Sequence, residues 1–270
     1  LNCIYLYKSI DSYRTLKTYS VHFIVGTVFS ILYGFIHRFL DGGLSFALIN
    51  TSILTRNSGA SGDPNYFGLY ILISVAFLLV FCVYEKKNSI LDFIISFFMI
   101  FMGLSSTSRM YYIMVIIIMF FISYAFLKNL FTKRFLWIVL LILLIVAIVF
   151  LVKDVIIQNL EFLITRFSDS DISNGRNSLK NRYVYYLEEN VIAELIGIGI
   201  PKYNIRSGIN VYAHNLYIEL IVCNGIIGIL LVVTAFVKFL IRHLDYHFLI
   251  IYTPLIMIAT AGFSLNFIEV

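Results

Sequence analysis

Charge, proline and paired cysteines are all scarce in this sequence, and each shortage narrows the class of protein. Only 13% of the 270 residues are charged, whereas soluble domains carry about a quarter, so the composition points to lipid as the solvent. With only three prolines, we expect long uninterrupted helices. The three cysteines are odd in number and widely spaced, which gives neither a disulfide framework nor a zinc-binding spacing. No Walker, dinucleotide-binding or Gly-x-Ser-x-Gly pattern occurs.

Apolar sequence is abundant, with 60% of the residues hydrophobic. A helix needs about 20 mostly apolar residues to cross roughly 30 Å of hydrocarbon, and barrel strands are shorter and alternate in polarity. The sequence therefore predicts an all-α fold, a polytopic transmembrane helical bundle that forms a single membrane domain over residues 1–270. Seven segments meet or nearly meet the length criterion: residues 19–37, 66–84, 89–106, 110–127, 135–152, 211–236 and 248–266.

Lysine and arginine in the short connections predict the orientation of the bundle. If the spans alternate in direction, one side receives ten basic residues and is predicted to be cytoplasmic: Lys8, Arg14, Lys17, Lys86, Lys87, Lys128, Lys133, Arg134, Lys238 and Arg242. The outer side then receives residues 38–65, the turn at Arg109 and a long loop at 153–210. The net charge of +5 does not indicate a nucleic-acid partner, because the basic residues punctuate apolar runs. The chain begins with Leu1 and shows no signal peptide, so we expect a fragment of a larger membrane protein.

The long outer loop at 153–210 is predicted to contain two amphipathic helices. The first has helical spacing of its apolar residues, which are Leu160, Leu163, Ile164 and Phe167. The second repeats an apolar residue every four positions, at Leu179, Tyr183, Leu187 and Val191. Its opposite face carries Lys180, Arg182, Glu188 and Glu189. We expect the two helices to cover the outer end of the bundle as a lid.

Three groups of polar and glycine residues on the outer side are candidates for chemistry. The first runs from Arg56 to Gly59 and continues with Asp63, Pro64, Asn65 and Gly68. The second is the turn Ser105-Ser106-Thr107-Ser108-Arg109. The third comprises Gly175, Arg176, Gly197, Gly199, His214, Asn215, Gly225 and Gly228.

Each of these residues also has a purely structural interpretation. A lone arginine at the interface snorkels or pairs with lipid head groups. Asp63 and Pro64 are typical of a helix start. Gly225 and Gly228 permit close helix packing, and His214 fits an interfacial histidine with its hydrogen bonds satisfied.

In order, however, the three groups resemble a family. The sequence Arg-x-x-Gly, Asp-Pro-Asn-x-x-Gly, Thr-x-Arg, Gly-Arg, Gly-x-Gly and His-Asn with Gly-x-x-Gly is similar to the O-antigen polymerase and ligase superfamily. The resemblance covers residues 56–228. One departure is Tyr183, which stands where members often have a tryptophan after Gly-Arg.

The resemblance implies a GT-C-like enzyme of the bacterial cytoplasmic (inner) membrane that transfers glycans at its outer face without a metal or another cofactor. The donor is a glycan on polyprenyl diphosphate, and the acceptor is a sugar hydroxyl. In a polymerase of O-antigen or capsule the acceptor is another lipid-linked repeat unit, whereas in a ligase it is a lipid-anchored core. The resemblance also implies that membrane lipid is a partner. A chain-length regulator protein is a possible further partner.

The residue types suit this chemistry. The leaving diphosphate gains negative charge, and the planar fork of arginine binds phosphate oxygens through two hydrogen bonds. We expect Arg56 and Arg109 to clamp the diphosphate and Arg176 to add a contact from the loop. Asn65 is expected to bind substrate at the same site.

The acceptor hydroxyl needs a base, for which His214 is the candidate because imidazole titrates near neutral pH. Asn215 and Glu219 are expected to lie on one face of the following helix and to contact substrate, since an acid within a span is costly unless it has a function. Glu219 is the alternative candidate for the base.

Two other patterns are discounted as metal sites. Asp169-Ser170-Asp171 has the spacing of nucleotide-sugar transferases but lies in an outer loop, and His243 and His247 lack further ligands nearby. Two other functions remain open, a polysaccharide transporter or flippase and a purely structural membrane protein. The arginines at the rim favour interfacial chemistry over both.

Overall fold

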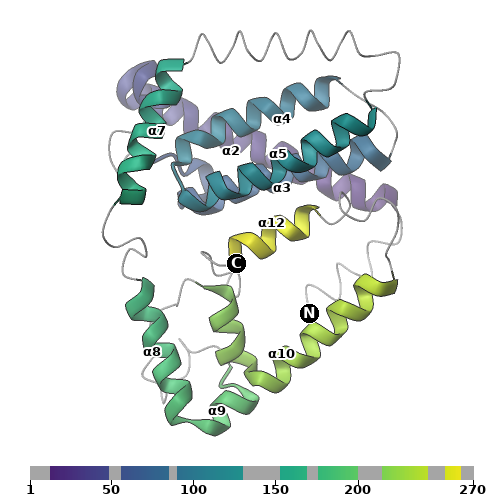
Figure 1. Cartoon of the computed structure of the whole chain (residues 1–270). Coiled ribbons are helices and arrows are strands. Elements are labelled where there is room, and N and C mark those ends of the chain that lie inside the picture. Colours follow the sequence, from purple (N-terminus) through teal and green to yellow (C-terminus); the bar gives the residue numbers. More distant parts are fainter. Residues whose placement is uncertain are drawn as a thin grey trace. The chain divides into compact units, whose positions relative to one another are not determined.

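The structure is a computed structural model that describes residues 13–48, 56–84, 90–129, 153–168, 176–199, 215–242 and 253–262. Every regular element within these ranges is a helix (Figure 1), which confirms the predicted all-α fold. The chain divides into two compact units. One comprises Leu1–Phe167 and Leu249–Met257, and the other comprises Ser168–Phe248 and Ile258–Val270.

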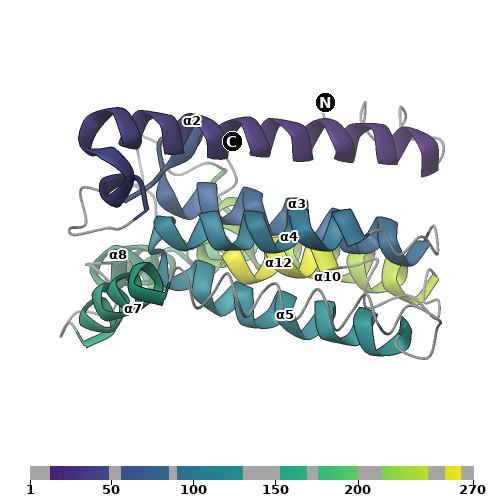
Figure 2. The ribbon, with the colours of Figure 1, turned by 90° about the horizontal axis from the view of Figure 1, so that it is seen from above.

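The first unit is built around helix α3, Pro64–Tyr84. This helix is apolar on all sides, which is typical of a helix enclosed by others, and it packs against α2 (Tyr13–Leu48), α4 (Ile90–Gly103) and α5 (Arg109–Asn129). Figure 2 shows these helices side by side. The buried side chains of α3 include Phe67, Leu69, Ile71, Leu72, Val75, Ala76 and Leu79.

Short turns of 3-10 helix connect these long helices at one end of the unit. Element η2 (Gly59–Ser61) precedes α3, and η3 (Leu104–Ser106) joins α4 to α5. The buried Tyr111 hydroxyl donates to the carbonyl oxygen of Ile100 at 2.6 Å. This bond fixes the start of α5 against the end of α4. Helix α7, Lys153–Ser168, also belongs to this unit, and its Asn159 side chain donates to Leu48 O at 3.0 Å.

The second unit contains α8 (Arg176–Glu189), α9 (Val191–Ile196), α10 (Leu216–Arg242) and the residues of α12 (Thr253–Gly262) from Ile258 onward. Both α8 and α9 pack against α10. Tyr183 of α8 is only 1% exposed and lies against Val222 of α10, with Leu187, Ile198 and Ile218 around them. Tyr183, the residue that departs from the family pattern, is therefore a core residue.

Six of the seven predicted spans coincide at least partly with described helices, and residues 135–152 lie outside the described residues. Within the described residues, three stretches are long and apolar enough to cross a membrane: Arg14–Leu44, Pro64–Cys82 and Leu216–Ala235. The other apolar helices are shorter, at Leu91–Ser106, Arg109–Ile122 and Thr253–Gly262. The chain thus has the helices of an integral membrane protein, and the total of seven spans stays a prediction.

The expectation of uninterrupted helices is wrong at two places, and glycine rather than proline is the cause. Helix α2 is interrupted at Gly42 and Gly43, and α10 is interrupted at Gly225. Gly43 and Gly225 have φ values of 74° and 64°, which other residues adopt only with strain. Helices α2 and α10 therefore each consist of two helical pieces, and only the break at Gly225 falls within a predicted span.

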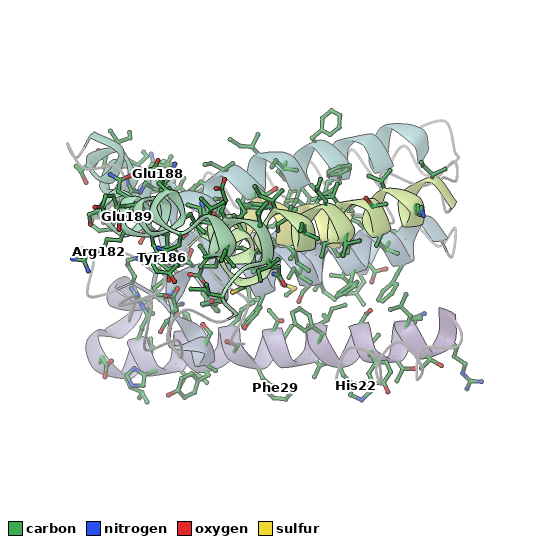
Figure 3. All side chains as sticks on the ribbon, turned by 90° about the horizontal axis from the view of Figure 1, so that it is seen from below. His22, Phe29, Arg182, Tyr186, Glu188 and Glu189 are labelled. Carbon is green, nitrogen blue, oxygen red and sulfur yellow. The ribbon has the colours of Figure 1, made fainter. Side chains whose placement is uncertain are left out.

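The two helices predicted within residues 153–210 are present as α7 and α8. Lys180, Arg182, Glu188 and Glu189 are exposed on α8, as predicted, and Figure 3 labels three of them. The stripe was expected to continue to Val191, but the helix stops at Glu189. Val191 begins α9 and is exposed. That α7 and α8 form a lid stays a prediction.

Candidate functional site

Two of the three predicted groups of residues meet in the first unit. The backbone N–H of Asn57 donates to the carbonyl oxygen of Ser105 at 3.1 Å, and its side-chain amide donates to Ser105 Oγ at 2.9 Å. Asn57 and Ser105 are both buried, where hydrogen bonds of this kind hold their partners firmly. The turn that follows α2 in the chain is thereby joined to the turn between α4 and α5.

Arg56 adds a second connection between the same turns. Its Nε donates to the carbonyl oxygen of Ser106 at 2.9 Å, and one of its terminal nitrogens donates to Asn65 Oδ1 at 3.3 Å. The same amide oxygen accepts a hydrogen bond of 2.6 Å from Ser108 Oγ. We name these residues the turn cluster, which comprises Arg56, Asn57, Asn65 and 105–109. Its bonds fix the plane of the Arg56 guanidinium.

Arg109 is the first residue of α5, directly after the buried residues Ser105 to Ser108. Its side chain is half-buried. Two residues earlier, Thr107 has a φ of 43° and is fully buried. A β-branched residue in the left-handed region is an outlier, and such strain is concentrated at functional sites. The turn cluster thus presents one arginine from each of its two turns.

Asp63 has the structural role that its sequence context indicates. Its Oδ1 accepts from the backbone N–H groups of Asn65 at 2.6 Å and Tyr66 at 3.3 Å. This is an N-cap, with Pro64 as the first residue of α3.

Replacing Asp63 by alanine is therefore expected to destabilise the protein by about 1 kcal/mol. The reason is that two N–H groups at the start of α3 lose their acceptor. Thermal unfolding of the full-length protein in detergent measures the loss. Asp63→Ser, which keeps a capping oxygen, should unfold near the wild-type temperature, and equal melting of Asp63→Ala and wild type would contradict the cap.

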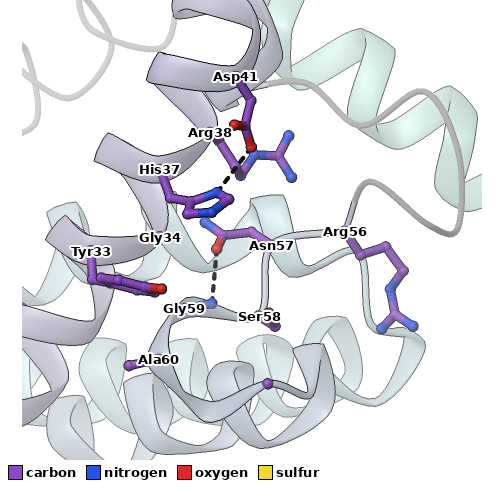
Figure 4. Close-up of a pocket in the computed structure, with 11 residues that line it drawn as sticks. Tyr33, Gly34, His37, Arg38, Asp41, Arg56, Asn57, Ser58, Gly59 and Ala60 are labelled. Atoms are coloured by element: carbon purple, nitrogen blue, oxygen red, sulfur yellow. Dashed lines mark hydrogen bonds and ion pairs between the residues drawn. The ribbon is translucent and has the colours of Figure 1, made fainter.

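A cavity of about 490 Å³ lies between α2 and the turn that begins at Arg56 (Figure 4). We name it the α2 cavity. Helix α2 lines it with Tyr33, Gly34, His37, Arg38 and Asp41, and the turn lines it with residues 56–60 and Gly62. Arg38 is only 6% exposed, and His37 Nδ1 lies 2.9 Å from Asp41 Oδ2.

His37, Arg38 and Asp41 were not predicted as site residues from the sequence. A weak signal was present, since Tyr33, His37 and Asp41 follow each other at intervals of four and so lie on one face of a helix. Charged residues at the end of an apolar run are ordinary, however, so this pattern alone does not indicate a site.

In the second unit, Asn215 caps α10. Its Oδ1 accepts from the backbone N–H groups of Tyr217 at 3.1 Å and Ile218 at 3.2 Å. Glu219 N donates to Asn215 O at 3.1 Å, which places the two residues on one face of the helix as predicted. The Glu219 side chain is 1% exposed. Asn215 thus has a structural role beside its predicted contact with substrate.

The Gly-x-Gly segment at 197–199 pairs with the backbone of α10, and this pairing explains why α10 has a glycine at position 225. A break at Gly225 takes away the helical donors of the carbonyl oxygens that precede it. Val222 O instead accepts from Ile198 N at 2.9 Å, and Cys223 O accepts from Gly199 N at 3.1 Å. A side chain on Gly197 would collide with Cys223 O, and one on Gly225 would collide with Leu195 O. Gly197 and Gly225 therefore permit two backbones to meet.

Several predicted residues lie outside the described part of the chain. These are Gly175, His214, the segment Asp169-Ser170-Asp171, His243 and His247. Arg176 begins α8, where only its backbone is described. Among the residues that the structure describes, no group of three or more histidine, cysteine, aspartate or glutamate side chains is arranged to hold a metal ion.

Comparison with known proteins gives one match. Residues 93–233, just over half of the chain, match a family model described as O-antigen ligase. The matched range contains Arg109, Arg176, His214, Asn215 and Glu219, and begins after Arg56 and Asn65. No curated protein and no solved structure matches the chain.

Proposed function

Since the chain belongs to the O-antigen ligase family, we propose that it is a membrane glycosyltransferase that takes a glycan from polyprenyl diphosphate. The proposed acceptor is a sugar hydroxyl on another lipid-linked repeat unit, which makes the protein a polymerase of O-antigen or capsule. The reaction takes place at the outer face of the cytoplasmic membrane and needs no metal ion.

The turn cluster is the observation that carries this proposal. It joins residues nearly fifty positions apart in the chain and ends at two arginines, Arg56 and Arg109, next to a strained Thr107. A charged group in an apolar bundle is costly, so two arginines beside one buried turn point to an anionic ligand. A diphosphate at the lipid surface is such a ligand.

The chemistry assigns a role to each arginine. When the bond between the sugar and the diphosphate breaks, the electron pair goes to the leaving phosphate oxygen. Donors that are already in place stabilise this charge without reorganisation. Arg56 is held by Ser106 O and Asn65, so its guanidinium is oriented before substrate arrives. Arg109 supplies the second fork, and Arg176 supplies a further contact from the outer loop.

The acceptor hydroxyl loses its proton to a base, and we propose His214 for this role. It directly precedes the capped start of α10. The buried Glu219 and the capping Asn215 share one face of that helix, where they orient the sugar.

Ligation to a lipid-anchored core is the second candidate function, and the description of the matching family favours it. Both reactions use the same donor and the same bond cleavage. They differ only in the molecule that carries the accepting hydroxyl, so an assay of the products must separate them.

The surface glycan of cells that lack the full-length gene tests the proposal. If the protein is a polymerase, glycan reduced to a single capped repeat unit is expected on a gel. Full-length chains left on the lipid carrier would identify a ligase instead. Complementation with Arg109→Ala or His214→Ala should reproduce the deletion, because one removes a phosphate donor and the other removes the base.

Two further results decide against parts of the proposal. An unchanged glycan profile on deletion would reject both enzymes. Normal polymer with His214→Ala would remove this residue from the mechanism. Immunoblots of membranes must show equal amounts of each variant, and Arg182→Ala, which replaces an exposed arginine of α8, is the control that should restore polymer.

A further inference from the structure

We propose that the α2 cavity is a saccharide subsite, which binds the donor sugar next to the diphosphate held by the turn cluster. This inference rests on the proposed function and adds to it the place where the glycan is recognised. Its lining combines an aromatic ring with planar polar side chains, and its volume of about 490 Å³ is in the usual range of small-molecule sites.

Tyr33 supplies the aromatic wall. Its side chain is 56% exposed although it lies in the cavity lining, so its ring is available to a ligand. Its ring centroid is 6.0 Å from that of His37, with an angle of 44° between the planes. Sugar rings present apolar C–H faces to such aromatic surfaces, while the tyrosine hydroxyl provides a polar end.

The polar groups of the α2 cavity match neighbouring sugar hydroxyls. Arg38 has only N–H donors, and Asp41 has only acceptor oxygens when it is ionised. His37 is oriented by its contact of 2.9 Å with Asp41. A hydroxyl both donates and accepts, so a pair of neighbouring hydroxyls needs this mixture of partners. A charged side chain in an apolar helix marks a candidate binding site, and Arg38, which is only 6% exposed, lines the cavity.

Asn57 connects the α2 cavity to the turn cluster. Its Oδ1 accepts from Gly59 N at 2.9 Å within the cavity wall (Figure 4), and its amide nitrogen donates to Ser105 Oγ at 2.9 Å in the cluster.

Gly34 lets α2 approach closely, because a side chain there would collide with Asn57 Oδ1. Arg56 also belongs to both places, since it lines the cavity and donates to Ser106 O. A ligand with a phosphate at the cluster thus has its first sugar within reach of α2.

Binding of two ligands to the full-length protein in lipid nanodiscs tests this subsite. One probe is polyprenyl diphosphate, and the other is the same lipid carrying the host's oligosaccharide repeat unit. Tyr33→Ala and Asp41→Asn are each expected to weaken binding of the glycosylated lipid about tenfold, because each removes one contact to the sugar. Their affinity for the bare diphosphate should stay within about twofold of the wild type. Arg109→Ala should weaken binding of both ligands.

Phe29→Ala is the matched control for Tyr33→Ala. Phe29, labelled in Figure 3, lies one turn earlier on α2 and is 68% exposed. It is not among the residues that line the cavity, so its loss should change neither affinity. Wild-type affinity of Tyr33→Ala and Asp41→Asn for both probes would overturn the subsite, and so would equal weakening for both probes. If the wild-type protein itself binds neither probe, the proposed function fails and the subsite fails with it.

Discussion

Replacing Arg109 by alanine is expected to lower kcat/KM for glycan transfer by about 10²–10³-fold, the usual effect of removing one preorganised donor to a developing negative charge. Arg109 begins α5 next to the buried turn 105–108, and we propose that it donates to the leaving diphosphate there. Transfer from the lipid-linked donor in membrane vesicles that contain the full-length protein measures the effect.

Arg109→Lys separates the role of charge from that of geometry. Lysine keeps the positive charge but lacks the planar fork, so activity between that of wild type and Arg109→Ala is expected. All three proteins should unfold within a few degrees of each other, because the side chain is only half-buried. Activity of Arg109→Ala close to the wild-type value would remove Arg109 from catalysis, whereas lost activity together with a much lower Tm would assign it a structural role.

Replacing Gly225 by alanine is expected to disrupt the packing of α9 against α10. Gly225 has φ 64° and ψ 179°, a conformation that is essentially restricted to glycine and costs other residues about 1–3 kcal/mol. The new methyl group would also collide with Leu195 O. The amount of full-length protein in the membrane and its Tm should both fall.

Two other glycines separate the causes of this effect. Gly199 has φ 74° but open space around it, so Gly199→Ala should show only the backbone cost of about 1–3 kcal/mol. Gly26 lies within α2 with nothing near its missing side chain, so Gly26→Ala should be neutral or slightly stabilising. We expect Gly26→Ala to have the highest Tm, Gly199→Ala a lower one and Gly225→Ala the lowest. If Gly225→Ala unfolded at or above the Tm of Gly199→Ala, the close approach of Gly225 to Leu195 O would not be required for packing.

Long apolar runs and capping residues were the parts of the fold that the sequence made predictable. Hydrophobic length alone predicted the start of α3 to within two residues. Asp63 and Pro64 also indicated this start, because capping depends only on neighbouring residues. The helix α8 was predictable from its spacing, since its charged face and its buried Tyr183 repeat at helical intervals.

The breaks in α2 and α10 were not predictable from local sequence. In sequence, a glycine within an apolar run indicates close helix packing. Whether the helix is interrupted at that glycine depends on a partner that is distant in the chain. For Gly225 this partner is the backbone of 197–199, which takes over the carbonyl oxygens of Val222 and Cys223.

The candidate site was predictable in its residue types but not in its assembly. Arg56 and Arg109 stood out as arginines at the ends of apolar segments, yet the bond from Arg56 to Ser106 joins residues fifty positions apart. Arg38 lacked any local signal, because the α2 cavity forms only when the turn after Arg56 closes against the helix.

The bond between the Gly-x-Gly segment and α10 has a consequence for biosynthesis. Unpaired carbonyl groups in the hydrocarbon cost several kcal/mol each, so we expect the candidate span α10 to enter the bilayer poorly with its break exposed. The ribosome makes residues 197–199 before it makes Val222 and Cys223, so the partner backbone is already present when the broken span emerges. The backbone N–H groups of residues 198 and 199, which bond to the carbonyl groups at the break, are thus synthesised before that part of α10.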